Sequence, residues 1–133
     1  MTERYFNPTE VEKLIPALSR VMESVMAAHA EAGEARERLR AEQHRIALAG
    51  GGVVDQAAWR ADAERLERLT RAVRAGLDEI RAMGGVPKDL GMGLVDFPHL
   101  RAGEPVDLCW KYGEQAIRYW HGLGEGYAGR KPL

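Results

Sequence analysis

Apolar residues in the first half of the chain recur at alternating spacings of three and four positions. This spacing places them along one stripe of a long helix and is typical of a coiled-coil seam. The middle of the stripe is rich in alanine, so a partner helix could approach it closely. Its members are Val11, Leu14, Leu18, Val21, Val25, Ala28, Ala32, Ala35, Leu39 and Ile46.

The ends of this first helix carry recognisable signals. Asn7 can accept a hydrogen bond from the Glu10 amide, and Pro8 suits the first helical position. Pro16 lies inside the pattern and removes one backbone hydrogen bond, so we expect a kink or a break into a short first helix. Three glycines at residues 50–52 end the helix.

A second helix follows, with Asp55 as its expected N-cap and Gly84-Gly85 as its end. Its stripe comprises Trp59, Leu66, Leu69, Val73, Leu77, Ile80 and Met83. A short loop between two long helices predicts an antiparallel hairpin with arms of roughly 45 Å. Because each helix would bury only one stripe, we expect two chains to pair as a homodimer with four helices. The alternative is that the C-terminal half folds back over the part near Pro16 and Met83.

The last third of the chain changes to a strand pattern with frequent turn residues. Alternation predicts strands at residues 94–97, 106–110 and 116–121, an edge strand at 86–90 and an irregular glycine-rich tail. The expected fold class is therefore α+β. A helical hairpin occupies residues 1–85, and a small antiparallel sheet with its tail occupies residues 86–133, packed as one unit with the hairpin base.

Composition narrows the classes of function. Nineteen Lys and Arg against twenty Asp and Glu give a net charge of −1, which argues against a nucleic-acid binder. The single cysteine excludes an intrachain disulfide, and no apolar run is long enough to cross a membrane. Without an apolar signal core at the start, we expect a cytoplasmic protein.

Five ligating side chains cluster in the sheet region: Asp96, His99, Cys109, Glu114 and His121. Strand alternation places Asp96, Cys109 and His121 on one face, and Phe97, Leu108 and Trp120 on the other. Such residues suit a divalent metal, zinc, iron or manganese, although no spacing matches a known ligand motif. A site with all five needs help from the tail, the helices or a second chain.

Each residue also has a purely structural interpretation. Asp96 can cap a turn, Cys109 can act as a small buried apolar group, Glu114 can accept in a turn, and His121 can bond a loop carbonyl. A thiol–imidazole–carboxylate nucleophile is a weaker hypothesis, because a mid-strand cysteine is poorly accessible. The aromatic group could wall a pocket, but a small sheet also needs bulky core residues. Its members are Trp110, Tyr119, Trp120 and Tyr127.

Several short motifs together resemble a known family. They are Tyr5-Phe6, Leu14-Ile15-Pro16, Leu94-Val95-Asp96-Phe97-Pro98, Leu108-Cys109-Trp110, Gly113-Glu114, Tyr119-Trp120-His121 and Gly129-Arg130. Across nearly the whole chain the sequence resembles domain-of-unknown-function family 2203, found in bacteria and archaea. The resemblance implies a helix-plus-sheet layout and a prokaryotic cytosolic protein. It implies no activity and no functional residue.

Our leading hypothesis is a small binding or assembly module that holds a divalent metal in its sheet. A rival is a metal-independent homodimeric scaffold whose helical arms recruit an unknown protein partner. A third hypothesis is a small hydrolase-like enzyme in which the metal activates water and Glu114 is the general base.

Overall fold

The first helix is long and unbroken. The computed structural model describes residues 4–50 and 55–133, and α1 spans Pro8–Leu48. The Asn7 side chain accepts from the Glu10 amide at 2.8 Å, and the Glu10 carboxylate accepts from the Asn7 amide, which completes a capping box. The helix continues through Pro16, so the expected break into a short first helix is wrong. Only one backbone hydrogen bond is lost there, and buried neighbours on both sides hold the helix together.

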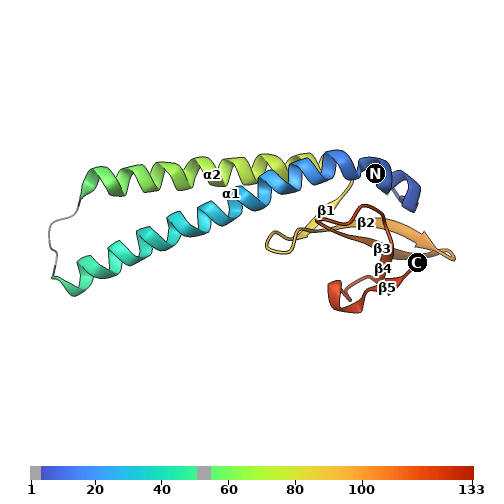
Figure 1. The fold of residues 1–133 in the computed structure, drawn as a ribbon. Helices are drawn as coiled ribbons and strands as arrows, with labels where there is room; N and C mark the ends of the chain where they lie inside the picture. Colours follow the sequence, from blue (N-terminus) through green and yellow to red (C-terminus); the bar gives the residue numbers. More distant parts are fainter. Residues whose placement is uncertain (1–3, 51–54) are drawn as a thin grey trace.

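The second helix, α2, spans Gln56–Ala82 and returns along α1. Asp55 caps it as expected, accepting from the Ala58 amide at 3.0 Å. Residues 51–54, which include two of the three glycines of the expected turn, lie outside the described residues. Gly76 allows a close approach between the helices, because a Cβ atom there would lie 2.2 Å from Val25 Cγ2. In Figure 1 the helices then separate toward the end that is farthest from the sheet.

A five-stranded antiparallel sheet in the order β1-β2-β3-β4-β5 follows the hairpin. Its strands are β1 (Val86–Asp89), β2 (Leu94–Arg101), β3 (Glu104–Lys111), β4 (Tyr119–Gly122) and β5 (Lys131–Pro132), with a 3₁₀ turn, η1 (Tyr127–Gly129), before β5. The expected α+β class is confirmed. The tail is less irregular than expected, since its last residues add the edge strand β5.

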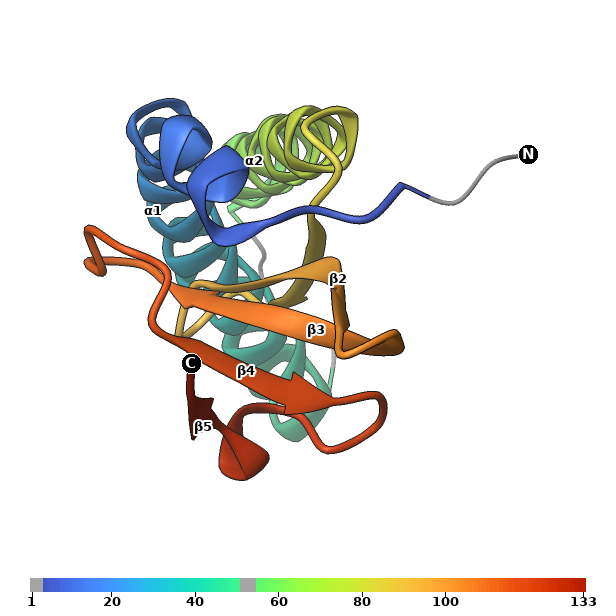
Figure 2. The same cartoon turned by 90° about the vertical axis from the view of Figure 1, so that its right-hand side faces the viewer.

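The sheet packs against the base of the hairpin (Figures 1 and 2). The shared core combines residues of both helices and of one sheet face with Phe6, which precedes α1, and Ile117, which lies between β3 and β4. Its other members are Val11, Ile15, Leu18, Met22, Val25, Ile80, Val95, Phe97, Leu108 and Trp110. Ile15 and Met22 lie outside the stripe that the sequence predicted for α1. They are buried because the base of α1 faces the sheet as well as α2, so it buries a second stripe.

The rest of the hairpin projects beyond the sheet and is only half covered. Ile80 is the one buried residue that α2 contributes over its 27 described residues. Trp59, Leu66 and Leu69 remain half-buried. None of the described helices combines the length and apolar character that crossing a membrane would require.

Candidate functional site

Strand register brings three of the five predicted ligating residues together. Asp96 of β2 lies directly opposite Cys109 of β3, and His121 of β4 lies opposite Asp107 of β3. Residues opposite each other share a face, and so do residues two positions apart on one strand. Asp96, Cys109 and His121 therefore share one face, as the alternation predicted.

This face is turned away from the helices, yet the three residues are buried. Their exposed fractions are 3%, 1% and 2% for Asp96, Cys109 and His121. One ligand atom from each of the three lies within 4.8 Å of the other two. The tail supplies the cover, since Gly124, Gly126 and Tyr127 line a recess of about 240 Å³ beside the three side chains. Asp107, Lys88 and Leu94 complete the wall of this recess.

Hydrogen bonds determine how the His121 ring is held. Its Nδ1 lies 2.9 Å from the Gly122 carbonyl oxygen, and its Nε2 lies 3.1 Å from Asp96 Oδ1. A carbonyl oxygen can only accept, so Nδ1 carries a proton and Nε2 is the atom available to a ligand. Burial by itself lowers the pKa of His121. The bonds to the Gly122 carbonyl and to Asp96 outweigh burial, and the net pKa is raised.

The neighbouring acidic groups, in contrast to His121, are shifted toward their neutral forms. Burial raises the pKa of the Cys109 thiol, and the nearby Arg130 guanidinium offsets this only in part. The pKa of Asp107 is raised by its own burial and then by the negative charge of Asp96. Negative charge on Cys109 and Asp107 is therefore costly in this recess, and a bound cation would stabilise the deprotonated thiol and carboxylate.

The other two predicted ligands are engaged elsewhere. His99 lies on the opposite strand face, where its Nδ1 is 2.6 Å from the Phe6 carbonyl oxygen. Glu114 is a turn acceptor, bonded by the Lys111 amide at 2.7 Å and by Arg130 Nη2 at 2.5 Å. The structure therefore brings Asp96, Cys109 and His121 together, and it places His99 and Glu114 in other local contacts.

The four aromatic residues serve different roles. Trp110 is fully buried in the core and donates its indole N–H to the Glu114 carbonyl at 2.9 Å. Tyr119 and Tyr127 flank the Arg130 guanidinium, whose carbon lies 4.3 and 4.9 Å from the two ring centres. Trp120 packs beside the core. Among the four, Tyr127 alone lines the recess.

Three residues outside the five predicted ligands also shape this region. Asp107 and Lys88 line the recess, and Arg130 Nη2 bonds the Cys109 carbonyl oxygen at 3.1 Å while pairing with Glu114. The position of Asp107 follows from strand alternation, because it lies two residues from Cys109 on the same strand face. The roles of Lys88 and Arg130 depend on how the edge strand and the tail fold over the sheet, which no local pattern specifies.

Fold and site together define a small α+β protein with a projecting helical hairpin and a buried Asp–Cys–His cluster on its sheet. The chain belongs to the DUF2203 family, described as an uncharacterized conserved protein, whose sequence profile matches residues 4–133. The expected family is thereby confirmed. Neither the curated proteins nor the solved structures contain a match.

Proposed function

We propose that this protein is a small metal-binding module in which Asp96, Cys109 and His121 hold a divalent cation, with zinc as the best fit. The observation that carries the proposal is the convergence of three different ligand atoms within 4.8 Å in a buried setting. Thiolate, imidazole and carboxylate are all established zinc ligands. Iron and manganese remain the alternatives, although a thiolate favours zinc over manganese.

The surroundings of the cluster support this assignment. The Nδ1–H of His121 points at a backbone carbonyl oxygen, the arrangement by which proteins orient a metal-ligating imidazole. Tetrahedral zinc holds its ligand atoms roughly 3.3–3.7 Å apart, given bonds of about 2.0–2.3 Å. Separations of up to 4.8 Å would therefore need to shorten by at most about 1.5 Å.

Three protein ligands leave a fourth tetrahedral position free for water or a small ligand. The recess of about 240 Å³ adjoins the cluster and has room for either. Asp107 lines this recess, whereas Glu114 is held by Arg130. If the site were hydrolytic, Asp107 would be better placed than Glu114 to accept a proton from bound water.

Metal analysis of untagged protein tests the proposal. We expect about one zinc per chain, or uptake of one equivalent on addition. Cobalt should give a thiolate charge-transfer band that disappears in Cys109→Ser, because Cys109 is the only cysteine. His121→Gln should also lose binding, while His99→Gln, a matched change outside the cluster, should retain it. Less than about one metal per ten chains, with no uptake of zinc, iron or manganese, would reject the proposal.

We infer a second property, self-association through the helical arms. It is supported by α2, which contributes Ile80 as its one buried residue and leaves most of its apolar stripe half-covered. A second hairpin would cover part of that stripe and form a four-helix dimer. The protein would then be a homodimer that carries one sheet site on each chain. Sedimentation of a monomer at micromolar concentration would refute this.

A further inference from the structure

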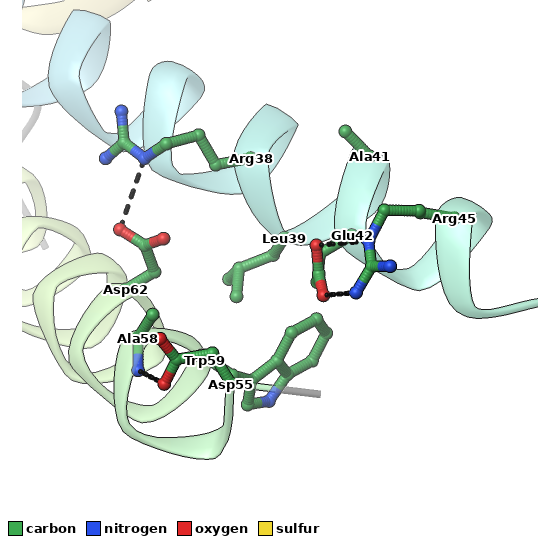
Figure 3. A pocket seen from close by; sticks show the side chains of 9 residues that line it. All are labelled: Arg38, Leu39, Ala41, Glu42, Arg45, Asp55, Ala58, Trp59 and Asp62. Carbon is green, nitrogen blue, oxygen red and sulfur yellow. Dashed lines mark hydrogen bonds and ion pairs between the residues drawn. The ribbon is translucent and has the colours of Figure 1, made fainter. Parts of the chain in front are cut away.

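One side of the helical hairpin carries two grooves between α1 and α2. The base groove, of about 600 Å³, is lined mainly by small or apolar side chains, among them Ser24, Ala28 and Ala72. The tip groove, of about 380 Å³, has Leu39, Ala58 and Trp59 in its lining, with charged residues around them (Figure 3). Both grooves are lined by the helices and the cap residue Asp55, so the sheet does not line either of them.

Residue spacing shows that the two grooves share a face. On α1, Glu31 lines the base groove and Arg38, seven residues later, lines the tip groove. On α2, Asp62 lines the tip groove and Leu69, seven residues later, lines the base groove. Residues seven apart point in nearly the same direction from a helix. We call the continuous surface formed by the two grooves and the residues between them the arm face.

Four charged residues form a band across the middle of the arm face. Arg65 Nη2 lies 3.6 Å from Glu31 Oε2, and Arg38 Nε lies 3.2 Å from Asp62 Oδ1, so each pair joins α1 to α2. Figure 3 shows Arg38 reaching across to Asp62. Charges of opposite sign also follow each other along each helix, Glu31 then Arg38 on α1 and Asp62 then Arg65 on α2. The band is thus a two-by-two checkerboard.

A checkerboard of charges is complementary to a second copy of itself. Consider a twofold axis that lies in the plane of the face and passes through the centre of the band. If the axis runs along the helices, α1 of one copy lies over α2 of the other. If it runs across the helices, one end of the band lies over the other end. In both cases each positive group comes to lie over a negative group of the other copy. We propose that the arm face pairs with the arm face of a second copy of this chain, with the charged band at the centre and the grooves on either side.

The size of the arm face fits a stable dimer. The 27 residues of α2 extend about 40 Å, and two packed helices are about 20 Å wide. Pairing would then cover roughly 800 Å² on each copy, the standard size for a specific interface. Exposed alanines such as Ala27, Ala72 and Ala75 line the base groove and let a partner helix approach closely. The small side chains provide contact, and the band provides selectivity for the second copy.

Charge-swapped variants test the face directly, in sedimentation equilibrium of the full-length protein with chelator present. Arg38→Glu with Arg65→Glu makes the band entirely acidic, and Glu31→Arg with Asp62→Arg makes it entirely basic. We expect each double variant alone to dimerise at least about tenfold more weakly than the wild type. An equimolar mixture of the two should form a heterodimer and recover the wild-type affinity. Lost ion pairs within one chain cannot be restored by mixing, so recovery reports contact between chains.

A matched control carries the same change on another surface of the arm. Arg60→Glu with Arg74→Glu alters residues that line separate grooves, and it should leave dimerisation unchanged. This inference rests on the proposed self-association, and the outcomes separate the two. A monomeric wild type overturns both. If the wild type dimerises, three results would overturn the arm face and leave the dimer intact. They are unchanged dimerisation of the acidic and basic variants, no recovery when the two are mixed, and an equal loss in the control.

Discussion

Two glycines inside the helices should respond in opposite ways to the same substitution. Gly33 of α1 has no atom within 4 Å of the place where a Cβ would lie. At Gly76 of α2, the same Cβ would lie 2.2 Å from Val25 Cγ2. Val25 is 1% exposed and β-branched, so its methyl groups have little freedom to move aside.

The magnitudes follow from two competing terms. Alanine is favoured over glycine in a helix interior by about 1 kcal/mol, and this gain applies at both positions. At Gly76 the added methyl group also overpacks the contact with Val25. At 2.2 Å this contact is so short that we place the cost at the upper end of the usual range, about 2–3 kcal/mol. We expect Gly33→Ala to stabilise the protein by about 1 kcal/mol and Gly76→Ala to destabilise it by about 1–2 kcal/mol.

Urea unfolding at one fixed protein concentration measures both changes, because self-association would make stability depend on concentration. Combining Gly76→Ala with Val25→Ala should cost less than the sum of the single changes, with a coupling of about 1 kcal/mol or more. A Gly76→Ala variant as stable as Gly33→Ala would show that α1 and α2 do not touch at this point.

Three further outcomes are expected. The folded-state pKa of His121 lies above the ordinary histidine value of about 6.5, so protonated His121 stabilises the metal-free protein below about pH 6.5. That contribution should disappear as pH rises through the folded pKa. Melting curves recorded in chelator from about pH 5.5 to 8.5 should show this loss of stability in the wild type and not in His121→Gln. Asp96→Ala removes the carboxylate that pairs with the buried His121 ring and should lower the free energy of unfolding in urea by about 3–5 kcal/mol. A loss below about 1 kcal/mol would contradict a buried pair. Phe6→Ala should also lower the free energy of unfolding by about 3–5 kcal/mol, because Phe6 is 2% exposed and packs edge-on against Phe97 at 5.3 Å between ring centres. An unchanged free energy of unfolding would mean that the N-terminal segment is not docked.

Some parts of the site could be predicted from residue patterns alone. Alternation along the strands placed Asp96, Cys109 and His121 on one face, because side chains two positions apart on a strand must point the same way. The same argument placed His99 on the other face. Alternation could not show which face meets the helices, since each face carries apolar and polar residues.

The amino-acid sequence by itself determined the local elements of this protein. The Asn7 and Asp55 caps, the two helical stripes and the positions of most strands depend on neighbours within a few residues, so composition and spacing suffice to predict them. Only the tertiary structure decided which groups are covered. Ile15 and Met22 are buried because the sheet docks on the base of α1, and the Asp–Cys–His cluster is buried because a glycine-rich tail folds over it. Burial depends on contacts between segments far apart in the chain, and it is burial that turns three polar side chains on a strand face into a candidate metal site.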